Sequence, residues 1–143
     1  MKKILTTFVY ILCCSCDEKK EVVNYYDNGQ IKSKGWMHNN YKEDSSIVYY
    51  PNGIVKEKGY WKNNKQDGKW VMFDSLGKKT AIIEFKNDLQ DGVSIFYEND
   101  RISQEASWNK GVLNGVGKIF YPNGNIKILL HWSNGKKHGK VFY

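Results

Sequence analysis

The chain has 143 residues, 41% of them hydrophobic and 15% aromatic, and a formal net charge of +7. This length allows one domain, and 13 glycines beside two prolines favour many tight turns over a large two-sided core. Nearly all of the positive charge is lysine, with Arg101 as the one arginine, whereas nucleic-acid readers rely on the guanidinium group. We therefore expect no nucleic-acid partner.

The first 15 residues have the pattern of a secretory signal. Lys2 and Lys3 precede an apolar run, residues 4–12, which is too short to cross a bilayer as a helix but matches the hydrophobic region of a signal peptide. All three cysteines follow within residues 13–16, an arrangement that does not fit a disulfide framework.

This cysteine cluster resembles a bacterial lipoprotein signal, in which a small residue precedes a cysteine that is lipidated and becomes the mature N-terminus. Ser15-Cys16 fits best because the polar chain begins directly afterwards, and Cys14 is the alternative. The family pattern has leucine three residues before the lipidated cysteine, where this chain has Cys13. We expect residues 1–15 to be a signal peptide and residues 16–23 a short tether, with the membrane reached through lipid on Cys16. An uncleaved N-terminal anchor is the other interpretation.

The remaining residues, 24–143, repeat with a period of 23–24 residues. Two columns keep this register, which indicates about five repeat units with an imperfect first and last unit. The first column is aromatic and comprises Tyr26, Tyr50, Phe73, Tyr97 and Tyr121. The second comprises Asp44, Gly68, Gly92, Gly115 and Gly139, and we interpret its glycines as turn or structural positions.

Each repeat carries two turn signals. The first, residues 50–53 with the sequence Tyr-Pro-Asn-Gly, suits a type I turn closed by a left-handed glycine. Its column holds Gly29, Gly53, Gly77, Asp100 and Gly124, and residues 74–77 indicate one extra turn residue in the third repeat. The second turn is predicted where the residue types that best tolerate positive φ recur, at Asn40, Asn64, Asp88, Gly111 and Gly135.

The segments between the turns are β-branched and aromatic, which predicts strands. Because a single hairpin is marginal in water, neighbouring hairpins must supply the missing burial. The sequence therefore predicts an all-β fold, an elongated single-layer antiparallel sheet of tandem β-hairpin repeats. A further apolar column should form a cross-strand aromatic ladder, comprising Met37, Trp61, Phe85, Trp108 and Trp132. Its four aromatic members are a candidate binding surface, with a purely structural role as the alternative.

These motifs resemble the bacterial variant of the MORN repeat. The resemblance rests on Tyr-Tyr-Pro-Asn-Gly with a lysine three residues later (Lys56, Lys127), then an aromatic residue and spaced glycines, and it covers residues 24–143. Proteins of this kind are often labelled YwqK-type antitoxins. The resemblance implies β-hairpin repeats and suggests protein or membrane-surface interaction, and it supplies no catalytic residue.

The sequence offers no grouping that suggests catalysis. Residues 17–143 contain no thiol, and His131 and His138 lie seven residues apart, which is not a recognised metal-ligand spacing. Residues 88–92 lack the carboxylate spacing of a calcium loop, and nothing in the sequence brings Glu84 near Glu105. We therefore expect no enzymatic activity, no cofactor and no metal.

The expected function is that of a non-enzymatic, membrane-anchored lipoprotein of the cell envelope whose repeats bind an envelope protein or a membrane surface. One alternative is an antitoxin or immunity protein, whose partner is a toxin. The other is a cell-wall glycan-binding protein, in which the aromatic column stacks on sugar rings.

Overall fold

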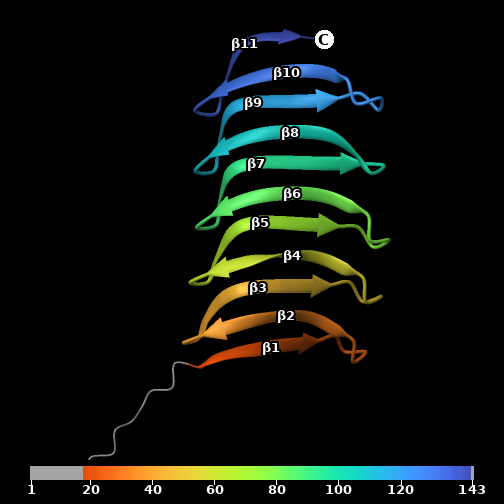
Figure 1. Ribbon diagram of the computed structural model, residues 1–143, viewed down its shortest axis with the longest axis vertical. Helices are drawn as coiled ribbons and strands as arrows, with labels where there is room; N and C mark the ends of the chain where they lie inside the picture. The colour runs from red at the N-terminus through yellow and green to blue at the C-terminus, as the bar shows by residue number, and fades with distance from the viewer. Residues whose placement is uncertain (1–17, 143) are drawn as a thin grey trace, which may run out of the picture.

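The computed structural model describes residues 18–142, with side chains up to His138, and shows one antiparallel sheet of 11 strands (Figure 1). The strands pair strictly in chain order. They are β1 (Lys19–Tyr25), β2 (Ile31–His38), β3 (Tyr41–Tyr49), β4 (Val55–Lys62), β5 (Lys65–Phe73), β6 (Lys79–Lys86), β7 (Leu89–Glu98), β8 (Arg101–Asn109), β9 (Val112–Phe120), β10 (Ile126–Ser133) and β11 (Lys136–Phe142). The predicted all-β hairpin-repeat fold is confirmed.

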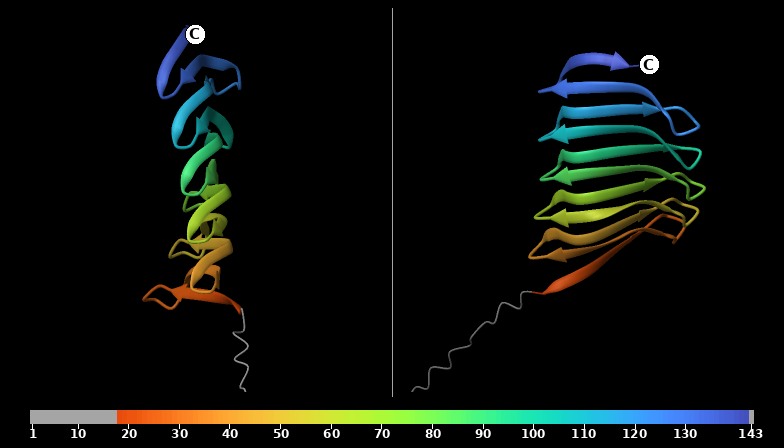
Figure 2. Two further views of the ribbon diagram at one scale, coloured as in Figure 1. Left: turned by 90° about the vertical axis from the view of Figure 1, so that its left-hand side faces the viewer. Right: turned by 45° about the horizontal axis from the view of Figure 1, so that its top comes forward.

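The sheet is a single twisted layer. Viewed edge-on it is thin, and the first and last strands lie at opposite ends of its long axis (Figure 2). The first strand begins at Lys19, inside the segment interpreted as a tether and before the predicted start of the repeats at residue 24. The predicted signal peptide and both candidate lipidation sites, Cys14 and Cys16, lie outside the described residues.

The first turn of the repeat has the predicted geometry. Gly53 N–H donates to the Tyr50 carbonyl at 2.9 Å, Tyr50 N–H donates to the Ile54 carbonyl at 2.8 Å, and the φ of Gly53 is 84°. A three-residue loop with a left-handed glycine thus closes the hairpin, and the loops at Gly29, Gly77 and Gly124 have the same hydrogen bonds.

The prediction that the first turn of the third repeat has one extra residue is wrong. Asp74, and not Phe73, occupies the position of Tyr50, because Asp74 N–H donates to the Lys78 carbonyl and Gly77 N–H donates to the Asp74 carbonyl. The irregular turn lies in the fourth repeat, where Asn99 and Asp100, with φ of 50° and 61°, connect β7 and β8 with only two residues.

The second turn lies at the predicted positions in every repeat, and the structure shows that it is a two-residue connection. Its two residues have positive φ throughout, in the pairs Asn39-Asn40, Asn63-Asn64, Asn87-Asp88, Lys110-Gly111 and Asn134-Gly135. This is the type I′ turn, whose twist matches that of the flanking strands.

The second marker column lies inside strands, at β-bulges. At Gly68, for example, Lys58 pairs with Val71 and Tyr60 pairs with Asp67, so two steps along β4 correspond to four along β5. The same shift surrounds Asp44, Gly92 and Gly115, all of which have positive φ. Bulges increase local twist, so this column sets the twist of the sheet. Gly139 lies in β11 beyond the described side chains, and its prediction stays a prediction.

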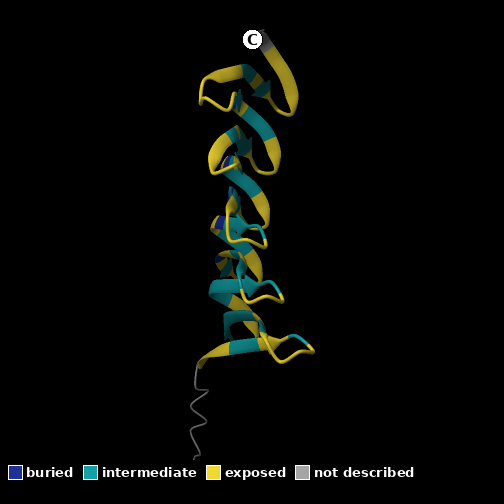
Figure 3. Ribbon diagram, turned by 90° about the vertical axis from the view of Figure 1, so that its right-hand side faces the viewer, coloured by how far each residue is buried: buried dark blue, intermediate teal, exposed yellow. Residues whose placement is uncertain are grey.

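The core is a row of side chains along the middle of one sheet face. Trp70 is 1% exposed and pairs with Ile83, Ile83 pairs with Ser94, and Ser94 pairs with Ala106. We call this side the tryptophan face, because it also carries Trp61. Among the described residues, full burial is confined to the central repeats, as the dark blue segments in Figure 3 show.

Candidate functional site

The four aromatic residues of the candidate surface all lie half-buried on the tryptophan face. They are Trp61, Phe85, Trp108 and Trp132. Within the described residues the expected ladder is not a continuous stack, because Trp70 lies between its members. Trp70 meets the Trp61 ring at 5.3 Å between centroids and 88° between planes, and the Phe85 ring at 6.4 Å and 81°. These edge-to-face contacts are a favoured aromatic geometry and stabilise the sheet.

Tryptophan rings cover the small residues of the central row. Trp70 lies directly over Gly59, because a Cβ placed on this glycine would come within 2.3 Å of the indole. Trp108 lies over Ser94, where its Nε1–H donates to Ser94 Oγ at 2.9 Å. Trp132 approaches Gly117, with Nε1 at 3.3 Å from a Cβ placed there. Each small residue therefore leaves space on the sheet surface for an indole ring.

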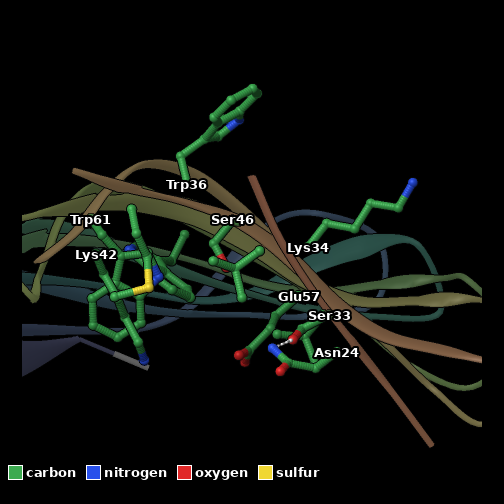
Figure 4. Close-up of a pocket in the computed structure, with 13 residues that line it drawn as sticks. Asn24, Ser33, Lys34, Trp36, Lys42, Ser46, Glu57 and Trp61 are labelled. Carbon is green, nitrogen blue, oxygen red and sulfur yellow. Dashed lines mark hydrogen bonds between the residues drawn. The ribbon is translucent and has the colours of Figure 1, made fainter. Parts of the chain in front are cut away.

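At one pair of small residues in this row the space is a pocket. Gly35 and Ser46 are paired neighbours on β2 and β3, and they line a pocket of about 250 Å³ on the tryptophan face (Figure 4). Trp36, Trp61 and Trp70 also line this pocket, and the Trp36 ring points away from the other labelled side chains (Figure 4). Ser46 and Trp70 occupy equivalent positions in successive repeats. The pocket exists because this position holds a small serine in one repeat and a tryptophan in the next.

The two ends of this pocket, which we call the Ser46 pocket, differ in charge. At one end Lys42 Nζ lies 4.3 Å from the centroid of the Trp61 ring, a cation–π contact. At the other end Asn24 Nδ2 donates to Ser33 Oγ at 3.0 Å, and Glu57 lies beside this pair (Figure 4).

Glu57 is half-buried between apolar neighbours, because its strand partners are Val48 on β3 and Met72 on β5. Among residues 18–142 its carboxylate has no ion-pair or hydrogen-bond partner. A half-buried carboxylate without a counter-ion is a site where a ligand cation gains more than it would at an exposed carboxylate.

Tyrosine and lysine side chains link the repeats at the first turn. Tyr26 and Tyr50 donate their hydroxyls to the carbonyls of Tyr49 and Phe73 in the following repeat, at 2.6 and 2.9 Å. Lysine ammonium groups lie over the turn tyrosines, with Lys56 at 5.9 Å from the Tyr50 centroid. The lysine of the sequence motif thus packs against the tyrosine of the same motif.

An ion pair ties the first strand to the third. Lys19 Nζ donates to the Asp44 carboxylate and lies 4.9 Å from the Trp36 ring centroid. The hydrogen bonds from Lys19 and from Ser45 N–H hold the pKa of Asp44 below its ordinary value of 3.8.

His131 and His138 are closer than their sequence spacing suggested. They pair directly across the β10–β11 hairpin, because a two-residue turn lies midway between them. Within the described part of the chain, no three His, Cys, Asp or Glu side chains gather as metal ligands do. The same residues include no helix that is long and apolar enough to cross a membrane.

Sequence reasoning missed two features of this site. It did not single out Trp70, the most buried aromatic side chain of the described chain. It also missed the Ser46 pocket. A signal for both exists two residues after the second marker column, where the chain reads Ser46, Trp70, Ser94 and Gly117.

Comparison with known proteins supports the repeat interpretation. The MORN repeat variant family matches residues 20–40, 46–63 and 113–134. Each match spans a hairpin closed by a three-residue turn ending in Asn-Gly, whereas the unmatched hairpins turn at residues 75–77 and 99–100. MORN repeats commonly serve as protein- or membrane-interaction modules. A comparison with curated proteins finds no match.

Proposed function

We propose that this protein is a non-enzymatic lipoprotein of the cell envelope, whose repeat sheet binds another protein. The observation that carries the proposal is the Ser46 pocket, a recess on the tryptophan face of a single-layer sheet. No second layer covers this face within the described residues, so a partner can reach the recess directly. The similarity of three hairpins to MORN repeat variants supports an interaction role.

Lipidation of Cys16 supplies the membrane anchor in this proposal, with Cys14 as the alternative acceptor. The run of residues 4–12 and the cysteines that follow it support export and lipid attachment. Since β1 begins at Lys19, only two residues separate Cys16 from the sheet, and the sheet would lie close to the membrane surface. Its first edge strand would be the part nearest to the lipid.

Metabolic labelling tests the anchor. Full-length protein is expressed in a bacterial host that is fed an alkyne-tagged fatty acid, as wild type, Cys16→Ser and Cys14→Ser. We expect label on the wild type and on Cys14→Ser, and none on Cys16→Ser. Unlabelled wild type that remains full-length in the cytosol would contradict the proposal and favour a cytosolic antitoxin.

The two alternatives differ in the partner. If the protein is an immunity protein, the partner that binds the tryptophan face is a toxin, and the toxin would bind at the same pocket. Glycan binding has less support, because sugar platforms need flat, exposed ring faces. Here Trp61 and Trp70 are perpendicular and half or fully buried.

A further inference from the structure

We propose that the Ser46 pocket receives an aromatic side chain from an extended segment of a partner protein, and that Glu57 binds a basic side chain two residues away in the same segment. This inference rests on the proposed interaction function and names the chemistry of the partner.

The protein's own packing shows which shape the pocket accepts. In the central row, the Trp70 ring covers Gly59. The Trp108 ring covers Ser94 and donates its indole N–H to the serine hydroxyl. Gly35 and Ser46 present the same small surface and the same hydroxyl, but the three atoms nearest to a Cβ added at Gly35 belong to Ser45 and Ser46 and not to a ring, while Trp61 and Trp70 line the pocket beside them. An indole from a partner protein would cover Gly35 and Ser46 in the way that Trp70 covers Gly59 and Trp108 covers Ser94.

The size of the pocket fits one side chain. Its volume of about 250 Å³ is below the range of roughly 300–1,000 Å³ that is usual for small-molecule sites. An apolar cavity of about 150 Å³ already accommodates benzene. The pocket therefore suits a single aromatic group anchored in a protein, which is the residue type that dominates binding energy at protein interfaces.

Glu57 gives the pocket a negative charge at one end. Its carboxylate lies at the edge of the pocket between Val48 and Met72, without a counter-ion among the described residues. A lysine or arginine of the partner would supply this counter-ion. At the other end Lys42 already lies over the Trp61 ring, so an additional cation is disfavoured there.

The distance between the pocket and Glu57 matches the spacing of side chains on an extended segment. Glu57 and Gly59 are two residues apart on β4, as are Ser46 and Val48 on β3, so the subsites are about 6.6 Å apart along the strands. Alternate side chains of an extended segment have the same separation and point to the same side. A partner segment with the pattern aromatic-x-basic matches both subsites when it lies along β3 and β4.

Fluorescence anisotropy tests the proposal with detergent-purified full-length protein and fluorescein-labelled peptides. The probe is Thr-Thr-Trp-Thr-Lys-Thr-Thr, with the tryptophan replaced by alanine in one control peptide and the lysine replaced by glutamate in another. We expect the probe to bind, the alanine peptide to lose binding by more than about tenfold, and the glutamate peptide to bind at least about two- to fivefold more weakly.

Two pairs of variants localise the binding. Ser46→Trp fills the pocket with the residue type that the chain uses one repeat later, and it should abolish binding, whereas Ser75→Trp in an exposed turn should not. Glu57→Gln should remove the preference for lysine over glutamate, whereas the exposed Glu98→Gln should retain it. Circular dichroism confirms that each variant is folded.

Several results would overturn the inference. They are failure of the probe to bind folded wild-type protein, equal binding to Ser46→Trp, or tight binding of an N-acetylglucosamine oligomer at this pocket in place of the peptide. Dimerisation that Ser46→Trp abolishes would show that a second copy is the occupant. Fatty-acid labelling of Cys16 does not depend on the pocket, so failure of the pocket is distinguishable from failure of the proposed membrane anchor.

Discussion

Replacing Gly59 with alanine should destabilise the sheet, although the backbone at this position does not require glycine. Gly59 is absent from the residues with positive φ, so alanine is compatible with its conformation. On backbone entropy alone, glycine to alanine at such a position stabilises a protein by about 0.4–1 kcal/mol. The opposing effect is steric. The new Cβ would lie 2.3–2.6 Å from three atoms of the Trp70 indole, which is 1% exposed and cannot move without losing contacts.

The steric effect should dominate. Overpacking a well-packed site costs about 1–3 kcal/mol, which leaves a net loss of about 1–2 kcal/mol after the entropic gain. If the indole is expelled, the loss approaches the roughly 3–5 kcal/mol of a Trp→Ala truncation, and the hydrogen bond from Trp70 Nε1 to the Tyr60 carbonyl, 3.2 Å long, is also lost.

The repeat supplies matched controls for this substitution. At Gly35 the nearest atom to a new Cβ is Ser46 Oγ at 3.5 Å, an ordinary contact, so Gly35→Ala should be neutral or stabilising by up to about 1 kcal/mol. At Gly117 the nearest atom is Trp132 Nε1 at 3.3 Å, and we expect an intermediate effect.

Urea denaturation followed by far-UV circular dichroism checks this order. At about 1–3 kcal/mol per M of urea, Gly59→Ala should lower the midpoint by roughly 1 M. Adding Trp70→Ser should remove most of the cost of Gly59→Ala, because serine leaves room for the new methyl group. Equal effects at Gly35 and Gly59, or an unchanged cost of Gly59→Ala in the Trp70→Ser background, would refute the reasoning.

Three further substitutions test contacts between repeats. Tyr50→Phe removes a hydroxyl that donates to the next repeat at 2.9 Å and should cost about 1 kcal/mol in urea denaturation, whereas Tyr121→Phe, whose hydroxyl has no such partner among the described residues, should be neutral. Asn64 Oδ1 accepts a 2.6 Å hydrogen bond from the backbone N–H of Lys42 in the preceding repeat. Asn64→Gly tolerates the positive φ but loses this bond, so it should be destabilising by about 1 kcal/mol in the same assay. Asn64→Ala should be destabilising by more, because alanine also tolerates positive φ poorly. Because its folded pKa is depressed, Asp44 contributes stability that is present above pH 3.8 and is lost as the pH falls through the folded pKa, and Lys19→Met should raise that pKa toward 3.8 in a carboxyl NMR titration. An unchanged Asp44 titration would contradict the role of Lys19.

Local chemistry explains why the repeat could be predicted from the sequence. Positive φ is available to few residue types, so the positions of Asn64 and Gly53 identify both turns directly. Once the turns are placed, the hairpin pairing and the chain-order sheet follow, since each turn fixes the register of the two strands that it joins.

The length of the first turn in the third repeat was predicted wrongly because residue type was a poor guide to the position that opens the turn. Phe73 is aromatic like Tyr50, but the residue that closes the turn is Asp74, whose carboxylate accepts the backbone N–H groups of Leu76 and Lys78 at 2.9 Å. An aspartate stabilises by side-chain hydrogen bonds a turn that elsewhere has a tyrosine at this position.

The pocket was missed because the signal in its column becomes readable only when the packing across strands is known. Trp70 covers Gly59 on the neighbouring strand, and the same column holds serine one repeat earlier, but sequence spacing alone does not show which side chains share a face beyond a bulge. The His131–His138 pairing was missed for a related reason, since their spacing becomes meaningful only when the turn between them is known to have two residues.

In-cell photo-cross-linking tests the central claim, that the tryptophan face binds a protein, most directly. A photoreactive phenylalanine analogue replaces Asn24 at the edge of the Ser46 pocket, in otherwise wild-type protein and in protein that carries Ser46→Trp. The account predicts one discrete protein adduct in the membrane fraction, identified by mass spectrometry and absent from the Ser46→Trp strain. No adduct, or an adduct of equal yield when the pocket is filled, would contradict it.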